Sequence, residues 1–389
     1  MRGHIRRRGK SGKSWELKYD VDREGGGRRI IYRSFRGSKR EAQTELARLL
    51  AQVADGGHVD PSRLTVADYV RERCAHWQAN GIISPLTAQR THQLIDGQII
   101  PHLGSRLVQK LSTRDIERWH TVLLTNGRRG RYGEPDGVSG VSPATVHRAH
   151  SVLQKSLDEG VRHGVVVKNV CRLQRPPKGD AKDVQILTPQ QVEDLPALLR
   201  GHALEAPALT SAFTGLRRGE LLALRWGNVD LDDEVIRVRQ SLEETRAGLR
   251  FKPPKSKAGV RDIKLPAIVT DVMHAHRKRE LERRLQLGQG KLTEDALVFP
   301  TWEGEPQRPN SFGSLWSKWA QAAGLNVSFH ALRHTHASQL IDMGVDVVTI
   351  SKRLGHSSPS ITLNVYAHLF RKDDSKAAAA INAALGRQA

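Results

Sequence analysis

The amino-acid sequence predicts a multidomain α+β protein. We expect a small three-stranded sheet with one helix, then an all-α segment, then a mainly α segment with a small antiparallel sheet. The length of 389 residues exceeds that of one ordinary domain. The apolar periodicity changes from alternating to helical at Thr65, and the Gly-, Pro- and Asp-rich stretches at 55–63 and 175–185 are typical of linkers. The predicted domains are 1–58, 64–174 and 183–389.

The first predicted domain contains three strands and one helix. Residues 3–8 and 28–35 are expected to be strands, and apolar side chains alternate along 14–21 as they do on a half-buried strand. Ser38 and Glu41 have the spacing of a capping box, which begins a helix. The apolar stripe of this helix consists of Ala42, Leu46, Leu49, Leu50 and Val53. We expect this stripe to pack on the sheet and to leave a basic sheet face open.

The second predicted domain is helical throughout. Its expected helices begin at Thr65, Thr87, Ser112 and Ser142-Pro143. Pro101 and Gly104 are expected to end the second of these helices, because proline interrupts a helix and glycine commonly follows one. The glycine- and arginine-rich stretch 126–142 is expected to be a long exposed loop.

The third predicted domain mixes helices with a few strands. Helices are expected from Thr188-Pro189, from about Ala206, over 270–286 and from Ser311, and strands over 234–240 and 296–300. We interpret 249–266 as a hairpin whose turn is the KSKAG segment, 255–259. The alanine-rich tail 376–386 would be a marginal helix alone, so we expect it to pack on a neighbouring subunit.

The stretch from Ser328 to Leu369 concentrates polar side chains of one chemical type. His330 and Arg333 are three residues apart and therefore share one face of a helix. A second helix is expected to end near Gly355, with His356 in the turn that follows it. Ten residues later, Tyr366 lies in a short helical stretch, 362–370. Imidazoles, a guanidinium and a phenol together suit a phosphodiester, because they can bind its oxygens, move protons and supply a nucleophile.

The net charge is consistent with a polyanionic partner. The chain has 62 Lys+Arg and 41 Asp+Glu, which gives +21, and its sequence pI is near 10.4. Such a field favours nucleic acid, and a small basic sheet can enter a DNA groove. The alternative is a basic surface that is simply solvated.

Several classes of protein are disfavoured by what the sequence lacks. Cys74 and Cys171 have neither the spacing of a metal site nor that of a disulfide framework, so a reducing cytoplasm is the simplest setting. No apolar run is long enough to span a membrane, and the basic N-terminus is not followed by the apolar core of a signal peptide. No Walker A pattern or acidic cluster occurs, so we expect no nucleotide cofactor and no metal.

Two earlier segments supply further candidate residues. Arg217, in TGLRRGELLALRW, follows a glycine where one helix meets the next, and Glu220 is placed to hold a guanidinium or an imidazole. Lys257 lies in the predicted hairpin turn, and Lys255 is the alternative lysine there. Taken singly, each of these residues, like each histidine and Tyr366, is more commonly a structural or solvated side chain. The occurrence of all these residues together, in this order along the chain, is what favours a functional role.

This ordered set resembles the tyrosine recombinases, also called the phage integrase family. The resemblance rests on Arg217 in its motif, a lysine in a β-hairpin, HALRHTHASQL, LGHSS, and Tyr366 ten residues beyond His356. It covers 185–389. The helical middle domain is similar to the family's core-binding domain by position and helix count. The first domain looks like the arm-type DNA-binding domain of integrases, which short Xer-type recombinases lack.

The resemblance implies a covalent mechanism without a cofactor. Tyr366 would attack the scissile phosphate, form a 3′-phosphotyrosine link and free a 5′-hydroxyl. Arg217 and Arg333 would bind the non-bridging oxygens, where negative charge develops. A phenolate is a good leaving group when the strand is resealed.

The remaining implied roles concern protons and the phosphate. Lys257, or Lys255 in its place, would donate a proton to the leaving 5′ oxygen. His330 would assist proton transfer to or from the tyrosine, and His356 would hydrogen-bond the phosphate.

The resemblance also implies partners. They are double-stranded DNA attachment sites, a homotetramer on paired sites, a DNA-bending host factor and an excision directionality factor, all in the bacterial cytoplasm and nucleoid. The segment after Tyr366 would bridge subunits, so we expect the assembled tetramer to control the placement of this tyrosine. An integrase of a phage or integrative element is the favoured interpretation. The alternatives are a Xer-like resolvase, a transposon recombinase, a type IB topoisomerase-like relaxing enzyme, or a non-catalytic DNA-binding regulator.

Overall fold

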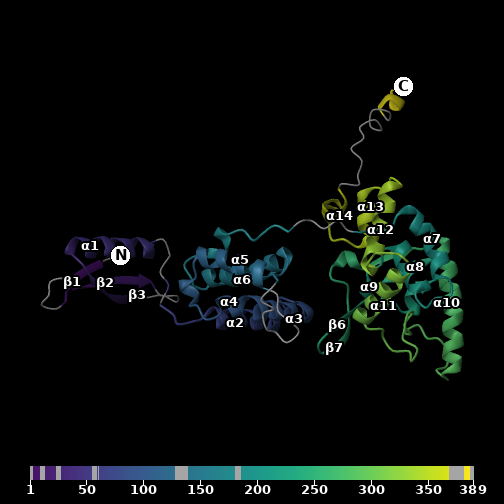
Figure 1. Cartoon of the computed structure of the whole chain (residues 1–389), viewed down its shortest axis with the longest axis horizontal. Helices are drawn as coiled ribbons and strands as arrows, with labels where there is room; N and C mark the ends of the chain where they lie inside the picture. Colours follow the sequence, from purple (N-terminus) through teal and green to yellow (C-terminus); the bar gives the residue numbers. More distant parts are fainter. Residues whose placement is uncertain are drawn as a thin grey trace. The chain divides into compact units, whose positions relative to one another are not determined.

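The computed structural model divides into two compact units, Met1–Ala181 and Lys182–Ala389, each of which is described by itself (Figure 1). The residues that the structure describes are 3–8, 14–22, 28–54, 59, 61–127, 139–179, 185–367 and 381–385. Within these residues, no helix combines the length and apolar character that crossing a membrane requires.

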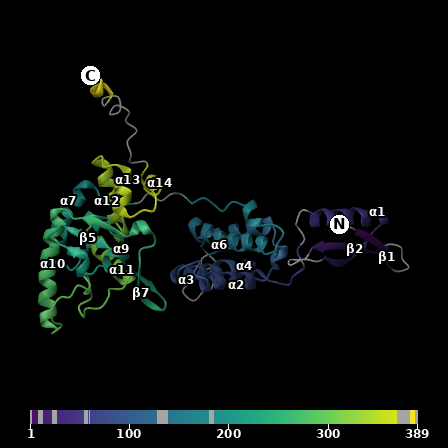
Figure 2. The ribbon, with the colours of Figure 1, turned by 180° about the vertical axis from the view of Figure 1, so that it is seen from behind.

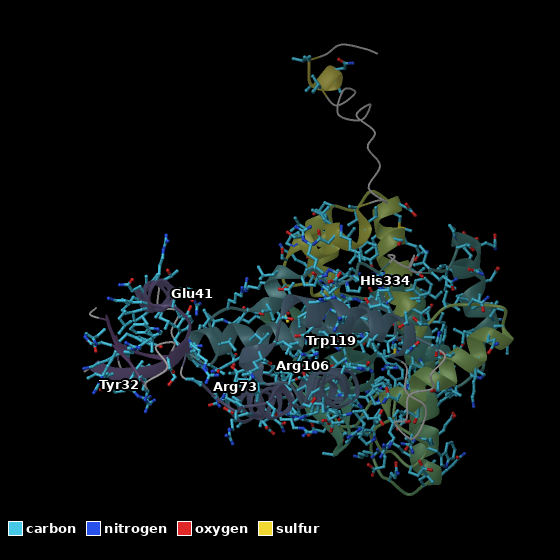
Figure 3. All side chains as sticks on the ribbon, turned by 60° about the vertical axis from the view of Figure 1, so that its left-hand side comes forward. Tyr32, Glu41, Arg73, Arg106, Trp119 and His334 are labelled. Carbon is cyan, nitrogen blue, oxygen red and sulfur yellow. The ribbon has the colours of Figure 1, made fainter. Side chains whose placement is uncertain are left out.

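The N-terminal part of the first unit is a three-stranded antiparallel sheet with one helix on it. The strands are β1 (Gly3–Arg7), β2 (Ser14–Asp22) and β3 (Arg28–Arg36), in the order β1-β2-β3, and the helix is α1 (Lys39–Ala54). The predicted capping box is confirmed, because the Ser38 amide donates to the Glu41 carboxylate at 2.7 Å. Leu17 and Tyr19 are buried with the apolar stripe of α1. Tyr32, which pairs with Lys18, lies on the opposite face and is 60% exposed (Figure 3).

The rest of the first unit is helical and has a hydrophobic core of its own. Its main elements are α2 (Val66–Ala79), α3 (Pro85–Leu94), a π-helical turn η1 (Ile95–Ile99), α4 (Ile100–Leu103), α5 (Thr113–Asn126) and α6 (Pro143–Arg162). The prediction that Thr87 begins the second helix is wrong, because the Ser84 side chain accepts from the Thr87 amide and Pro85 occupies the first turn. Pro101 does not end that helix either. It lies in the first turn of α4, directly after η1, and Gly104 ends the run.

The second unit surrounds one large hydrophobic core with helices and two small antiparallel sheets. Its strands are β4 (Val229–Asp230), β5 (Val235–Val238), β6 (Ser241–Thr245), β7 (Gly248–Lys252) and β8 (Arg261–Lys264). Its helices are α7 (Pro189–Leu199), α8 (Glu205–Thr214), α9 (Arg218–Leu222), α10 (Ala267–Gln286), α11 (Pro309–Ala322), α12 (Phe329–Asp342), α13 (Val347–Leu354) and α14 (Pro359–Tyr366). Both views show α10 along one edge and α12, α13 and α14 gathered together (Figures 1 and 2).

The predicted hairpin around KSKAG is wrong. β7 pairs with β6, whereas β8 pairs with β5 in the other sheet, in the order β4-β5-β8. Pro253 and Pro254 follow β7 directly, and because proline has no amide donor the strand cannot continue its pairing. Lys257 instead begins a short 3-10 turn, Lys257–Gly259, that leads into β8.

Other boundaries in this unit differ from the expectation. Residues 296–300 form no strand, although Leu297 makes an isolated bridge with Arg225. α11 begins at Pro309, before Ser311, and α14 begins at Pro359, where the Ser358 side chain caps it. The expected loop at 126–142, the linkers and the tail 376–386 lie partly outside the described residues.

Candidate phosphate-binding active site

Two helix C-termini form the base of the site. α8 ends at Gly215 (φ 69°) and α13 at Gly355 (φ 66°), both in the left-handed region that favours glycine. A Cβ at Gly215 would lie 2.7 Å from Leu354 Cδ2 and 2.8 Å from His336 Cδ2, so a larger residue does not fit there. These distances also show that the end of α8 lies against α12 and the end of α13.

The turn after α13 positions His356, as predicted. The Gly355 amide donates to the Lys352 carbonyl and the His356 amide to the Ser351 carbonyl, each at 3.0 Å. This pair of hydrogen bonds is a Schellman motif, which reverses the chain and satisfies the last carbonyls of the helix. His356 is thereby held directly beyond the helix end.

Arg217 and Arg333 donate to these two helix ends. Arg333, which is 3% exposed, donates to the Gly215 carbonyl at 2.6 Å and to the Leu354 carbonyl at 2.7 Å. Arg217 precedes α9 and donates to the Gly355 carbonyl at 3.1 Å. Helix C-termini carry partial negative charge and therefore attract guanidinium groups. Burial, followed by the charge of Arg217, lowers the pKa of Arg333 to about 9, so Arg333 is still mainly cationic at neutral pH.

Glu220 links a third arginine to this pair. Its buried carboxylate accepts from Arg217 Nη1 at 2.7 Å and from Arg261 Nη2 at 2.9 Å. The prediction that Glu220 holds a guanidinium is confirmed. Burial raises the pKa of Glu220, but Arg261 and Arg217 outweigh that effect and the pKa is lowered. Arg261 also donates to the Arg353 carbonyl at 2.7 Å, which ties β8 to α13.

Tyr366 is held by a histidine that we did not single out from the sequence. The Tyr366 hydroxyl lies 2.6 Å from His334 Nδ1, and the side chain of Tyr366 is buried. His330 is an exposed residue in the first turn of α12, and its ring is edge-on to that of His334 at 4.9 Å between centroids. The spacing of four residues within HALRHTHASQL was the available signal, because such residues are neighbours on a helix.

Burial favours the neutral forms of the rings in the site. Burial raises the pKa of Tyr366 to about 12, although Arg333 opposes this shift. Burial, then Arg333, lowers the pKa of His334. The pair is therefore neutral near pH 7, and when the imidazole proton is on Nε2 the phenol O–H donates to Nδ1. Desolvation of the ring, followed by the electrostatic effects of His334 and Arg333, lowers the pKa of His330 to about 4.

His356 is oriented by α14. Its Nδ1 lies 2.8 Å from the hydroxyl of Thr362, a fully buried residue. Burial, followed by Arg333 and Arg217, lowers the pKa of His356 to about 4. When the Thr362 hydroxyl donates to Nδ1, the proton of the neutral ring is on Nε2, where it can be donated to a phosphate oxygen.

The segment 255–259, which contains Lys255 and Lys257, lies next to Gly355, the residue before His356. A Cβ at Gly355 would be 3.0 Å from the Ala258 carbonyl oxygen, and Arg261 donates to the Gly259 carbonyl at 3.1 Å. Lys255 and Lys257 are both exposed in this segment. Among the described residues, no group of three or more His, Cys, Asp or Glu side chains could hold a metal ion.

The chain is similar to known recombinases and integrases. Residues 185–373 match the phage integrase family. The chain is 25% identical to a tyrosine recombinase XerC-like protein of Caldanaerobacter subterraneus subsp. tengcongensis, over 96% of this chain and 97% of that one. It is 27% identical to an integrase of Streptomyces ambofaciens, over 94% of each chain.

A similar fold occurs in a solved structure of the Tn1549 transposon integrase in complex with a circular intermediate DNA. The TM-score is 0.68 at 20% identity, and the match covers 82% of this chain and 99% of that chain. Together with the helices and small antiparallel sheets of the chain, this match confirms the predicted multidomain α+β class.

Proposed function

Because the chain belongs to the phage integrase family of tyrosine recombinases, we propose that it is a site-specific DNA integrase that integrates, and by the same chemistry excises, a phage or integrative element. Site-specific recombination through a 3′-phosphotyrosine intermediate is the general activity of this family. The observation that carries the proposal is the convergence of two guanidinium groups and a buried phenol in one unit. Arg217 and Arg333 donate to the adjacent carbonyls of Gly355 and Leu354. The charge of Arg333 also acts on the buried Tyr366 hydroxyl and opposes the rise of its pKa.

Tyr366 is the proposed nucleophile. Its oxygen attacks the scissile phosphorus, the bond to the 5′ oxygen breaks, and the phosphate becomes linked to the tyrosine. His334 accepts the phenolic proton, because its ring contacts the hydroxyl at 2.6 Å. His330 lies beside His334 and is exposed, so it is placed to pass that proton to solvent. This assignment gives His334 the first proton step and His330 an assisting one.

The cations and His356 bind the phosphate. Arg217 and Arg333 each use part of the guanidinium to bind main-chain carbonyls, and the remaining N–H donors face developing charge on the non-bridging oxygens. His356 donates from Nε2. Lys257, with Lys255 as the alternative, protonates the leaving 5′ oxygen from the turn beside Gly355.

The domain assignment is supported by the separate cores. We assign 1–58 to arm-type DNA binding, 64–174 to core binding and 183–389 to catalysis. The sheet with α1 and the helical part have different hydrophobic clusters, and Tyr32 is exposed on the sheet face away from α1. In the full chain, Tyr32→Ala should remove the footprint on arm sites and leave the core-site footprint. An unchanged arm footprint would contradict the assignment.

The partners follow from the reaction. The substrate is double-stranded DNA carrying attachment sites. Exchange between two duplexes breaks four strands, so four nucleophiles are needed, and we propose a homotetramer on paired sites with the segment after Tyr366 as the subunit bridge. A host bending protein and a directionality factor complete the proposed assembly, which acts on DNA in the bacterial cytoplasm. The XerC-like and transposon relatives favour a resolvase or transposon recombinase as the second candidate.

A suicide substrate tests the chemistry. A duplex built from the junction that flanks the gene, nicked beside the cleavage point, should trap a covalent adduct with the full chain. Tyr366→Phe should abolish the adduct while DNA binding persists, and His334→Ala should slow its formation more than it weakens binding. Absence of an adduct with the native chain would refute the enzymatic proposal. Recombination between the two ends of one molecule, without insertion into a second, would favour the resolvase.

A further inference from the structure

A cavity of about 720 Å³ opens beside the proposed active site. It lies between the beginning of α9 and one face of α11, and its lining includes Arg218, Lys318 and His330. None of the residues that line it is acidic. A cavity with cationic donors and no carboxylate favours an anion.

Arg218 lacks a partner within the described part of the chain, unlike its neighbour. Arg217 is held by Glu220 and by a main-chain carbonyl, whereas no hydrogen bond or ion pair joins Arg218 to any described residue. Burial lowers the pKa of Arg218, and the nearby Glu244 partly opposes that shift. The Glu244 carboxylate is already bound by Arg308 at 3.2 Å and by the Asn310 amide at 3.0 Å. The half-buried guanidinium of Arg218 therefore has unused donors.

Small residues on α11 make room for this guanidinium. A Cβ at Gly313 would collide with Arg218 Nη1, so glycine lets the side chain lie against the helix. Ser314 and Ser317 also line the cavity, but their hydroxyls donate to carbonyls of the same helix, each at 3.0 Å. The charged donors available toward a ligand are Arg218 and the exposed Lys318.

We propose that Arg218, with Lys318, binds a second phosphodiester of the DNA strand, adjacent to the one that Tyr366 attacks. His330 belongs both to this cavity and to the proposed site, so a strand that places one phosphate at Arg217 and Arg333 continues past His330 into the cavity. The contact holds the strand in place while the neighbouring bond is broken. This inference rests on the proposed function, because it assumes that DNA is the substrate.

The salt dependence of DNA binding by the full chain tests the contact. Each phosphate that a protein neutralises changes the slope of log K against log salt by about 0.9. Arg218→Ala should therefore reduce the magnitude of the slope by about 0.9, and Arg218→Lys should restore most of it. Arg200, an exposed arginine that follows α7 and does not line the cavity, supplies the matched control Arg200→Ala, which should leave the slope unchanged.

Neutral phosphates in the DNA test the same contact without altering the protein. Methylphosphonates are placed one at a time on either side of the scissile position of the suicide duplex. At one position the substitution should weaken binding by the native chain severalfold and have no further effect on Arg218→Ala. If every position affects both proteins equally, or if the salt slope of Arg218→Ala equals the native slope, the inference is wrong. Failure of the native chain to form an adduct would instead refute the proposed function, since the slope is measured without cleavage.

Discussion

Replacing Glu220 by glutamine removes the one carboxylate that joins Arg217 and Arg261. The side chains of Glu220 and Arg261 are 3% and 7% exposed and lie 2.9 Å apart. Glutamine has nearly the same shape and keeps an acceptor oxygen, so the main change is the loss of negative charge. Three arginines, including Arg333, would then be close together without a buried counter-ion, and we expect the second unit to be destabilised.

The size of this loss of stability follows from how deeply the ion pairs of Glu220 with Arg261 and with Arg217 are buried. Breaking a buried ion pair by removing one partner costs about 3–5 kcal/mol. The pair with Arg217 is discounted to less than about 1 kcal/mol, because the Arg217 side chain is 37% exposed and solvent screens it. Since the glutamine amide retains one hydrogen bond, we expect the free energy of unfolding of the second unit to fall by about 3 kcal/mol in total. For a unit of this size, about 2–4 °C per kcal/mol gives a fall of about 6–12 °C in Tm.

Calorimetry of the full chain measures this shift. The chain has at least two compact units, so its unfolding is not treated as two-state. Leu195→Ala, at a fully buried position of the second unit, identifies the transition that belongs to this unit. Asp262→Asn is the matched control, because Asp262 pairs with Arg239 at 2.7 Å but is 55% exposed, and it should cost less than about 1 kcal/mol. Equal shifts for Glu220→Gln and Asp262→Asn would refute the argument from burial.

The lowered pKa of Glu220 fixes how the stability from its ion pair with Arg261 changes with pH. The pKa of Glu220 is lowered in the folded chain, so the folded state releases its proton more readily than the unfolded state does. Its stabilisation is complete above the unfolded pKa of about 4.3 and is lost as the pH falls through the folded pKa. The native chain should therefore lose this contribution only in acid, whereas Glu220→Gln lacks it at every pH.

Two further predictions concern a crowded glycine and a buried histidine pair. Gly215→Ala should destabilise the second unit by more than Gly344→Ala, because both have positive φ (69° and 79°) but only Gly215 is crowded, and calorimetry of the two variants measures the difference. His120 Nε2 lies 3.0 Å from His150 Nδ1 in the core of the first unit, and burial, then His150, lowers the pKa of His120 to about 4. The unfolded chain binds more protons below about pH 6.5, so this unit should lose stability as the pH falls from about 7 to 5, and His150→Leu should weaken that dependence. A pH-independent Tm of the first unit would contradict the last expectation.

Helix starts were predictable from the sequence where the signal is local. Ser38, Thr65, Ser112 and Thr188 each cap a helix at the expected position, because the side chain and the amide that it accepts from are three residues apart. Strand pairing was not predictable in the same way. The alternation in 249–266 shows two strands but not their partners, and the partners lie in β5 and β6. The two prolines after Lys252 were the signal against a hairpin.

The site was predictable to the extent that one contiguous stretch contains it. His330, Arg333, His356 and Tyr366 come from Ser328–Leu369. The helix before His356 ends at Gly355 as expected, whereas α14 is Pro359–Tyr366 and not 362–370. His334 was missed because a histidine one turn along a helix equally suits a core position, and only the fold of α14 brings Tyr366 to it. The same limitation applies to Arg261, whose contact with Glu220 spans 41 residues.

The hydrogen bonds from Arg217 and Arg333 to main-chain carbonyls explain how these guanidinium groups lie close together with few carboxylates beside them. Arg217 follows the end of α8 but donates to the end of α13, and Arg333, from α12, donates to the ends of both helices. Because the carbonyls at a helix end have no partners within the helix, they supply fixed acceptors without a full negative charge. Carboxylates in their place would neutralise the guanidinium groups and repel a phosphate. Carbonyls hold the same groups and leave their positive charge available for the proposed phosphate, so the left-handed glycines 215 and 355, which end the two helices, act by positioning the arginines.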